Sequence, residues 1–211
     1  MFTSGTSGNS KGVMLSHENI AEDINSSCKL FVLKGNVIAV LPFHHAFGLV
    51  VAVLMVLNYG YAVYINRSLK TIQKDLQIAK PQTMFLVPMF VETFHKQIWT
   101  NAKKEGKEKL LHGMMKISDA LLKLGIDVRK KAFASVRSAF GGLIEYIICG
   151  GAPLGIQYVK EFRSFGIEIL NGYGTTECSP CAAVNRNLYH RDGTVGVAVP
   201  GVDVKVSDSG E

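Results

Sequence analysis

Hydroxyl, glycine and lysine residues crowd the beginning of this chain, in the stretch Phe2-Thr-Ser-Gly-Thr-Ser-Gly-Asn-Ser-Lys-Gly-Val13. Small residues let backbone N–H groups close around phosphate oxygens, and Lys11 adds a mobile positive charge. The stretch does not match the Walker A pattern, because no Gly-Lys pair follows Gly5 or Gly8 at the required spacing. From composition alone, the stretch is either a phosphate-binding loop of another kind or a plain flexible turn.

Three further clusters join small residues to groups that can bind a ligand. Leu41-Pro-Phe-His-His-Ala-Phe-Gly48 carries two histidines and two aromatic rings, and Cys149-Gly-Gly-Ala-Pro-Leu154 is a small-residue turn that a flat ligand can approach. Asn171-Gly-Tyr-Gly-Thr-Thr-Glu177 combines a tyrosine that can stack, two hydroxyls and a carboxylate. Each cluster alone is ambiguous, since such residues also build ordinary turns.

Short β-branched or aromatic runs alternate with longer helical patterns and position these clusters. The predicted strands are Val37–Leu41, Tyr61–Ile65, Thr83–Val87, Tyr146–Cys149 and Glu168–Leu170. The predicted helices are His17–Leu30 with Ser16 as N-cap, Leu49–Asn58, Leu69–Ala79 with Ser68 as N-cap, Val91–Lys103 and Ile156–Phe165. This alternation predicts an α/β fold with a largely parallel sheet flanked by helices. The clusters fall at the carboxyl ends of predicted strands, where such sheets bind ligands.

Composition and cysteine usage narrow the class of protein. The chain has 211 residues, of which 47% are hydrophobic and 19% charged, as in a soluble globular domain. Polar residues directly after Met1 argue against a signal peptide, and interruptions within residues 37–65 argue against a membrane span. Four scattered cysteines suit a reducing cytoplasm. Cys178-Ser-Pro-Cys181 lacks a second ligand pair, so we expect neither zinc binding nor redox exchange there.

The net charge of +6 is concentrated in residues 96–137, which hold eleven Lys or Arg against four Asp or Glu. In the segment 104–137 that interrupts the alternation, apolar residues recur at helical spacing beside lysines: Leu110, Met114, Ile117, Leu121 and Leu124. The favoured interpretation is a helix that docks this stripe on its own domain and exposes a basic face. Peripheral contact with a membrane surface or an anionic partner stays an alternative. No nucleic-acid motif accompanies the charge, so nucleic acid is not an expected partner.

The last part of the chain has a different composition, rich in Gly, Val and Asp after residue 188. It predicts short antiparallel strands around Val202–Val206 and a turn at Asp208-Ser-Gly210. We therefore expect an α/β subdomain over residues 1–188, with the helical insert at about 104–137, and the start of a truncated β-rich subdomain over residues 189–211.

Taken together, in this order and spacing, the clusters resemble those of the adenylate-forming superfamily of acyl-CoA synthetases, luciferases and peptide-synthetase adenylation domains. The resemblance covers nearly the whole chain and rests on FTSGTSGNSKG, LPFHHAFG, ICGGAPL, NGYGTTE and the later Gly193-Thr-Val-Gly196 and Pro200-Gly-Val-Asp203. Phe140-Gly-Gly142, the NGYG stretch and the extra helical segment are most similar to long-chain fatty acyl-CoA synthetases. The resemblance implies the α/β fold of the N-terminal domain of these enzymes.

The resemblance also implies roles for individual residues in ATP binding. The β- and γ-phosphates would be held by Thr3, Ser4, Gly5, Thr6, Ser7, Gly8 and Lys11. Gly151, Ala152 and Pro153 would form one wall of the adenine slot, with Tyr173 stacking on the base and Gly172, Gly174 and Thr175 completing the loop. Thr176 would donate to the α-phosphate, and Glu177 would bind Mg²⁺.

For the acid, the resemblance implies that His45 steadies the carboxylate against the α-phosphorus. Phe47, Gly150, Gly174 and the apolar helix from Leu49 would border the acyl pocket. His44 is expected to be a packed or capping histidine. The implied catalytic residues are His45, Thr176, Glu177 and Lys11. The implied reaction joins a fatty acid to ATP as an acyl-adenylate with release of pyrophosphate, and CoA then forms the thioester.

Two alternatives stay open beside a fatty acyl-CoA ligase. One is an adenylating ligase for another acid or acceptor, such as an aryl acid or an acyl carrier protein; an amino acid is disfavoured because no carboxylate lies in residues 45–51 to bind its ammonium. The other is a non-catalytic nucleotide-binding fragment. Members of the superfamily continue with a ribose-binding aspartate and a C-terminal domain with a catalytic lysine, and neither is found before Glu211. We therefore expect an internal fragment that binds ATP weakly and does not turn over.

Overall fold

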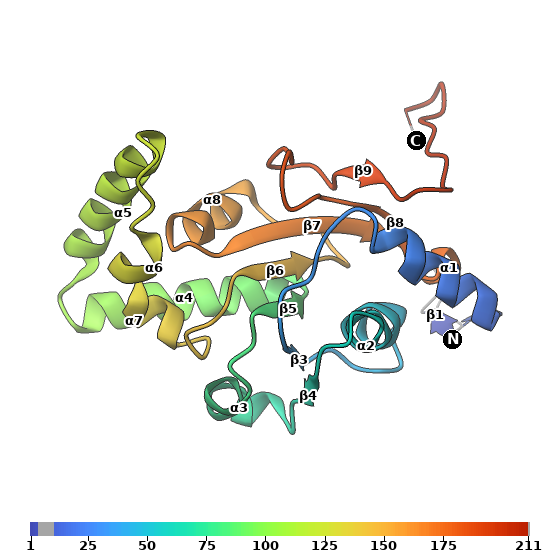
Figure 1. Cartoon of the computed structure of the whole chain (residues 1–211), viewed down its shortest axis with the longest axis horizontal. Helices are drawn as coiled ribbons and strands as arrows, with labels where there is room; N and C mark the ends of the chain where they lie inside the picture. Colours follow the sequence, from blue (N-terminus) through green and yellow to red (C-terminus); the bar gives the residue numbers. More distant parts are fainter. Residues whose placement is uncertain (4–10, 211) are drawn as a thin grey trace.

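A seven-stranded sheet forms the centre of the computed structural model, which describes residues 1–3 and 11–210 (Figure 1). Its strands lie in the order β4-β3-β5-β6-β7-β8-β9. They span Val37–Ala39 (β3), Val63–Ile65 (β4), Thr83–Leu86 (β5), Tyr146–Cys149 (β6), Glu168–Gly174 (β7), Cys181–Val184 (β8) and Val197–Ala198 (β9). The five strands from β4 to β7 run parallel, and β8 and β9 add antiparallel to β7. The predicted largely parallel sheet is therefore confirmed.

The parallel strands form because their apolar runs are buried on both faces of the sheet. Met84, Phe85 and Leu86 of β5 are fully buried, as are Val37 and Ile38 of β3. All five predicted strands are present. Strand β7 extends past the predicted end to Gly174, because β8 pairs with its last residues.

Most predicted helices are present, with shifted ends. They are α1 (His17–Ser27), the π-helix η1 (Phe47–Leu54) continued by α2 (Met55–Asn58), the 3₁₀ turn η2 (Leu69–Thr71) continued by α3 (Ile72–Ala79), α4 (Pro88–Lys104) and α8 (Ile156–Ser164). Ser16 caps α1 as predicted, in a reciprocal capping box with Asn19. Ser68 lies at the predicted N-cap position, directly before η2, but its side chain makes no capping bond.

Helices α2 and α3 lie on opposite sides of strands β3 and β4 (Figure 1). This is the arrangement that right-handed crossovers require when the chain moves outward from β3 to β4 and then back to β5. The order in which the chain adds strands to the sheet therefore reverses between β3 and β5, although the two strands are parallel. The crevice at the carboxyl ends of two such strands is the usual ligand site of an open α/β sheet.

The predicted helical insert consists of α5 (Glu108–Lys123), α6 (Arg129–Ala132) and α7 (Ala134–Ser138), which gather at one end of the molecule (Figure 1). Helix α5 contacts α4, α6 and α8, so docking on its own domain is confirmed. The docked face matches the predicted stripe only in part: Met114 and Leu121 are half-buried, and Met114 packs against the core. Leu111 and Ser118 are buried, whereas Leu110, Ile117 and Leu124 are 59%, 65% and 75% exposed. The buried and the exposed residues both recur at helical spacing, and the two rows lie about 100° apart around the helix, one residue out of step.

The C-terminal part of the chain adds little regular structure. Residues 202–207 form no strand, so the strand predicted at Val202–Val206 is wrong; Val204 and Val206 are both 67% exposed and have no sheet face to pack on. The turn predicted at residues 208–210 is confirmed by a bond from the Gly210 N–H to the Ser207 carbonyl. The division into subdomains at residue 188 stays a prediction.

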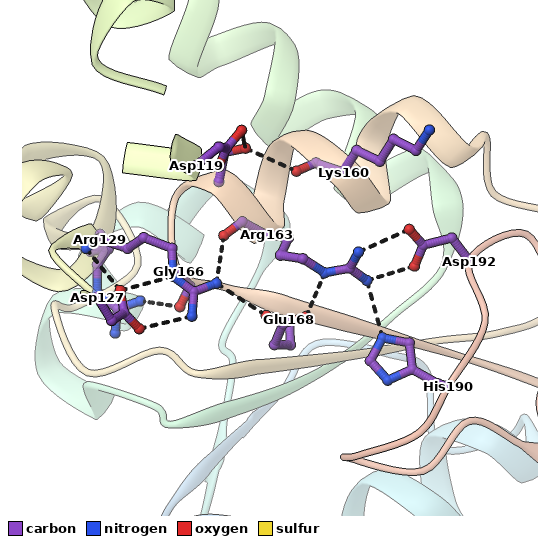
Figure 2. Close-up of polar contacts among 11 residues, drawn as sticks. Asp119, Asp127, Arg129, Lys160, Arg163, Gly166, Glu168, His190 and Asp192 are labelled. Atoms are coloured by element: carbon purple, nitrogen blue, oxygen red, sulfur yellow. Dashed lines mark hydrogen bonds and ion pairs between the residues drawn. The ribbon is translucent and has the colours of Figure 1, made fainter. Parts of the chain in front are cut away.

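An ionic network fixes the start of β7 to α8 and to the segment that follows β8 (Figure 2). Arg163 of α8 binds Asp192 through both terminal nitrogens, at 2.9 and 2.5 Å, and its Nε donates to Glu168 at 3.0 Å. Its Nη2 also lies 3.1 Å from the His190 ring. The bond with Asp192 is the main cause that raises the pKa of Arg163 and lowers that of Asp192. The network therefore belongs to the end of β7 that is opposite the predicted ligand site.

No helix among the residues that the structure describes is both long enough and apolar enough to cross a membrane.

Candidate active site

A cavity of about 820 Å³ opens at the carboxyl ends of the parallel strands, on both sides of the reversal between β3 and β5. Five segments line it, each of which follows or ends one parallel strand. They are residues 39–48 from β3, 65–69 from β4, 87–90 from β5, 148–151 from β6 and 172–176 from β7. Residues 31, 51, 55, 180, 181 and 184 complete the wall. The cavity therefore lies at the predicted place, the carboxyl ends of the parallel strands.

The segment after β3 turns sharply and brings His45 and Phe47 to the cavity. The turn is closed by a bond from the His45 N–H to the Pro42 carbonyl at 3.2 Å. Gly48 is required there, because a Cβ at this position would lie 2.3 Å from the same carbonyl oxygen. The Phe47 ring packs edge-on against Phe85 of β5, at 6.2 Å between centroids, so its orientation is fixed by the core. His45 remains exposed to solvent and to the cavity.

The segment after β6 presents backbone to the cavity at Gly150 and Gly151. Gly151 has a φ of +85°, a conformation that favours glycine. A Cβ on Gly150 would meet the Phe47 ring at 3.5 Å, so the two segments lie against each other. Ala152 and Pro153 follow as exposed residues just outside the lining.

The end of β7 carries Tyr173, whose ring is 58% exposed at the cavity wall. Gly174 then pairs with Cys181 of β8, and the loop 175–180 leaves and returns between these two residues. A Cβ on Gly174 would lie 1.8 Å from the Pro180 carbonyl, so only glycine lets the loop close this tightly. The loop contains the 3₁₀ turn η3 (Thr176–Cys178) and presents Thr175 and Thr176 to the cavity. Glu177 is exposed beside them.

The structure therefore brings nine of the predicted residues together around one cavity: His45, Phe47, Gly150, Gly151, Gly172, Tyr173, Gly174, Thr175 and Thr176. Ala152 and Glu177 each directly follow a lining residue, and Pro153 comes one residue later. Thr3 and Lys11 pair with each other across the ribbon of β1 (Phe2–Thr3) and β2 (Lys11–Gly12) and are not among the lining residues. Ser4, Gly5, Thr6, Ser7 and Gly8 lie outside the described residues.

Apolar side chains from five separate elements or loops form one wall of the cavity, and they include Phe31, Val51, Met55, Leu69 and Met89. Val51 and Met55 belong to the helix from Leu49 that was expected to border the acyl pocket. Phe31, Leu69 and Met89 were not predicted from the sequence. No charged side chain lines the cavity within residues 1–3 and 11–210 apart from the titratable His45. The cavity is therefore suited to a ligand with a long uncharged part.

A buried carboxylate holds the segment that β4 contributes. Asp75 is fully buried and accepts bonds from the Asn66 side chain at 2.9 Å and from the Arg67 guanidinium at 2.6 and 3.2 Å. The Arg67 bonds are the main cause that lowers the pKa of Asp75 to about 2. Asn66, Ser68 and Leu69 are thereby kept at the cavity wall. This segment follows the predicted strand that ends at Ile65, so it could have been found from the expectation that ligands bind at the carboxyl ends of parallel strands.

The cysteines of the site are not poised as nucleophiles. Burial raises the pKa of Cys149 to about 12 and that of Cys181 to about 11, so both thiols are neutral near pH 7. The groups left for chemistry are an imidazole, hydroxyls, backbone N–H groups and a nearby carboxylate. Such a set can bind a ligand, orient it and neutralise its charge.

Comparison with known proteins gives one family. The model of the family described as AMP-binding enzyme matches residues 1–211. Human long-chain-fatty-acid–CoA ligase 1 is 28% identical over 98% of this chain and 31% of its own length. The long-chain-fatty-acid–CoA ligase FadD15 of Mycobacterium bovis is 27% identical over 100% of this chain and 38% of its own. The chain thus spans about a third of the length of these relatives.

Solved structures agree on the fold. ATP-bound MatB from Rhodopseudomonas palustris superposes with a TM-score of 0.68 and 26% identity, over 99% of this chain and 35% of that one. The o-succinylbenzoate–CoA synthetase MenE of Bacillus subtilis, in complex with ATP and magnesium, superposes with a TM-score of 0.63 at 19% identity, over 100% of this chain and 37% of its own. The second likeness supports the fold alone.

Proposed function

Because the chain belongs to the AMP-binding enzyme family, we propose that its cavity binds ATP and a fatty acid for the formation of an acyl-adenylate. In the complete reaction CoA then takes the acyl group as a thioester. The observation that carries the proposal is the composition of one continuous cavity: an exposed aromatic ring and hydroxyls at one wall, and a long uncharged apolar wall beside them. Similarity to long-chain-fatty-acid–CoA ligases supports the same substrate class.

ATP is proposed to lie along the segments that follow β6 and β7. The exposed face of Tyr173 offers a stacking surface for adenine, and the glycine backbone at 150 and 151 leaves room for a flat ring. The Thr176 hydroxyl, which lines the cavity a few residues further along, would donate to the α-phosphate. Lys11 and the loop before it would hold the β- and γ-phosphates. The likeness to MatB, whose structure was solved with ATP bound, supports ATP as the ligand.

Mg²⁺ fits the donors of this loop. Glu177 is an exposed carboxylate next to the proposed phosphate site, and Mg²⁺ is usually bound by one or two carboxylates together with substrate phosphates. The metal would neutralise charge on the phosphates. The protein's own contribution is to hold Glu177 at this place through the turn η3.

The fatty acid is proposed to lie with its alkyl chain against Val51, Met55 and the other apolar wall residues. The exposed His45 imidazole lines the same cavity and would orient the carboxylate. A carboxylate oxygen then attacks the α-phosphorus, and the bond to the β-phosphate oxygen breaks to release pyrophosphate. In the second step the CoA sulfur attacks the acyl carbon, the thiol proton leaves to solvent, and AMP departs.

The second candidate is a ligase of the same kind for another acid or acceptor, such as an aryl acid or an acyl carrier protein. The same fold serves a different acid in MenE of Bacillus subtilis, which is an o-succinylbenzoate–CoA synthetase. The lining disfavours a substrate with a second charged group, because no Asp, Glu, Lys or Arg among the described residues lines the cavity. The isolated chain, a third the length of its relatives, is proposed to bind ATP without completing the reaction.

ATP binding tests the proposal with a matched pair of variants. Tyr173→Leu should weaken ATP binding by the 5- to 150-fold that corresponds to about 1–3 kcal/mol of base stacking. Tyr189→Leu makes the same change at an 87% exposed tyrosine outside the cavity and should leave affinity unchanged. Calorimetry with Mg·ATP measures both. Equal affinity of the two variants would reject Tyr173 as the adenine platform.

A membrane surface is the proposed partner of the exposed ridge on α5. Leu110, Ile117 and Leu124 project together at seven-residue spacing, and Lys109, Lys116 and Lys123 run beside them with the same period. Apolar side chains flanked by lysines fit an anionic lipid surface.

Vesicles that contain anionic phospholipid test this contact. Ile117→Glu should reduce sedimentation with the vesicles, and added salt should reduce the binding of the unaltered chain. Ile78→Glu, at a 55% exposed position of α3, is the matched control. Equal binding of both variants would reject the ridge as the membrane contact.

A further inference from the structure

Asp23 of α1 is a buried carboxylate that reaches across the molecule to the strand behind the cavity. The residue is 7% exposed, and its Oδ1 accepts a hydrogen bond from the Cys181 N–H at 3.0 Å. The two residues are 158 positions apart in sequence. Its Oδ2 is buried and has no hydrogen-bond partner among the residues that the structure describes. A buried carboxylate with one bond opposes folding, so its presence calls for an explanation other than stability.

The donor of this bond lies at the foot of the loop that carries the proposed phosphate and metal ligands. The loop 175–180 leaves β7 at Gly174 and re-enters the sheet at Cys181, and these two residues pair across the sheet. Cys181 also lines the cavity. The backbone at Cys181 therefore sets where the loop ends, and with it the place of Thr176 and Glu177.

Helix α1 is itself held in place independently of this bond. It begins in the capping box at Ser16 and contacts the π-helix η1, whose own residues line the cavity. The helix also follows the N-terminal segment that contains Lys11 by only a few residues. The bond from the Cys181 N–H to Asp23 thus ties α1 to the foot of the loop 175–180.

We propose that Asp23 is a positioning residue for ATP: by accepting the Cys181 N–H, it fixes the foot of loop 175–180 and so holds Thr176 and Glu177 toward the nucleotide. The part of this inference that concerns ATP rests on the proposed function. The anchoring of the loop does not depend on that function and can be measured separately.

Two substitutions of Asp23 separate hydrogen bonding from charge. Asp23→Ala removes the acceptor and leaves the Cys181 N–H unpaired, and Asp23→Asn keeps a carbonyl oxygen at Oδ1. A hydrogen bond to a charged or buried partner corresponds to about a tenfold to hundredfold change in an equilibrium constant. We expect Asp23→Ala to weaken Mg·ATP binding about tenfold or more, and Asp23→Asn to stay within about threefold of the unaltered chain.

Asp192→Ala is the matched control for loss of stability. It also removes a mostly buried carboxylate, with its ion pair to Arg163, but at the opposite end of β7. Six residues of strand place that end about 20 Å from the loop. This variant should have a lower free energy of unfolding and an unchanged ATP affinity, with binding measured at a temperature where all variants are folded.

Amide hydrogen exchange in the absence of nucleotide supplies the separate readout. Asp23→Ala should speed exchange at the amides of residues 175–181, while exchange in β5 and β6 stays slow and Asp192→Ala leaves residues 175–181 unchanged. If Asp23→Ala does not fold, Asp23→Leu fills the same space without an acceptor and takes its place.

The outcomes are distinct. Unchanged exchange at 175–181 in Asp23→Ala overturns the anchoring role. Faster exchange with unchanged ATP affinity overturns the positioning of the nucleotide. If the unaltered chain binds no ATP, the proposed function fails and the link to ATP with it, while the exchange data still decide whether Asp23 anchors the loop.

Discussion

The buried carboxylate of Asp23 makes a prediction about the pH dependence of stability. Burial raises its pKa from 3.8 to about 7, and the bond from the Cys181 N–H offsets only part of that rise. In the unfolded chain the group regains an ordinary pKa near 4. The folded chain therefore holds a proton between about pH 4 and pH 7 that the unfolded chain has already lost.

The sign of the effect follows from this difference in bound protons. Because the folded state binds more protons over that range, the free energy of unfolding falls as the pH rises from about 4 to 7, and then levels off. A shift of about three units corresponds to about 4 kcal/mol over the full range, at about 1.4 kcal/mol per unit. Between pH 5 and pH 8 the decline amounts to about 3 kcal/mol. This is a large fraction of the roughly 5–15 kcal/mol that stabilises a typical domain.

Asp23→Asn isolates this contribution, because it removes the titration and keeps the shape of the side chain. Urea unfolding of both proteins at pH 5, 6, 7 and 8 gives the free energies of unfolding. Burial is the main cause that raises the pKa of the nearby thiols of Cys28 and Cys181, so both stay largely neutral up to pH 8 in either protein. Their contributions therefore cancel in the difference between the two.

We expect the stability of Asp23→Asn relative to the unaltered chain to rise by about 3 kcal/mol from pH 5 to pH 8. A constant offset between the two proteins is compatible with the reasoning, since a buried amide can leave one N–H unpaired at every pH. Stability curves that run parallel across this range would refute it.

Three further changes follow from the geometry. Gly174→Ala should abolish ATP binding, because the new Cβ would lie 1.8 Å from a backbone carbonyl oxygen. In Gly172→Ala the new Cβ would lie 3.5 Å from its nearest atom, so this control variant should bind ATP normally in the same calorimetric assay. Gly113→Ala, in the interior of α5 with nothing within 4 Å of the new Cβ, should stabilise the chain by about 1 kcal/mol in urea unfolding; lower stability would contradict this. Glu177→Gln should weaken the Mg²⁺ dependence of ATP binding, and Glu22→Gln, an exposed position on α1, should not.

The parallel strands could be predicted from the sequence because each one is a short apolar run that is visible in its own segment. The run Tyr146–Cys149 is β-branched and apolar and is buried in the middle of the sheet, so its pattern and its environment agree. Strand β8 at Cys181–Val184 carried no such signal, since its four small residues form a strand only because they pair with the end of β7. For α5, Leu110 and Leu111 both continued a helical pattern. Which of them docks depends on contacts with α4, α6 and α8.

The candidate site was predictable where small and polar residues follow a strand, as at His45, Gly150 and Tyr173. Its apolar wall was predictable only where the helix from Leu49 supplies Val51 and Met55. Phe31, Leu69 and Met89 could not be assigned to the wall, because their place there depends on which strands are neighbours. Asp23 gave no signal at all. Its position in α1 looks like an ordinary polar helix residue until the fold places it against Cys181, 158 residues away.

Stable acyl-adenylate analogues test most directly whether one cavity holds both the nucleotide and the alkyl chain, because their binding to the 211-residue chain requires no turnover. We expect an analogue with a long alkyl chain to bind at least about tenfold more tightly than one with an acetyl group, since each buried CH₂ contributes about 0.8 kcal/mol. The long-chain advantage should persist in Tyr173→Leu, with both affinities reduced. Tighter binding of an aminoacyl analogue, or equal affinity for long and short chains, would contradict the proposed cavity.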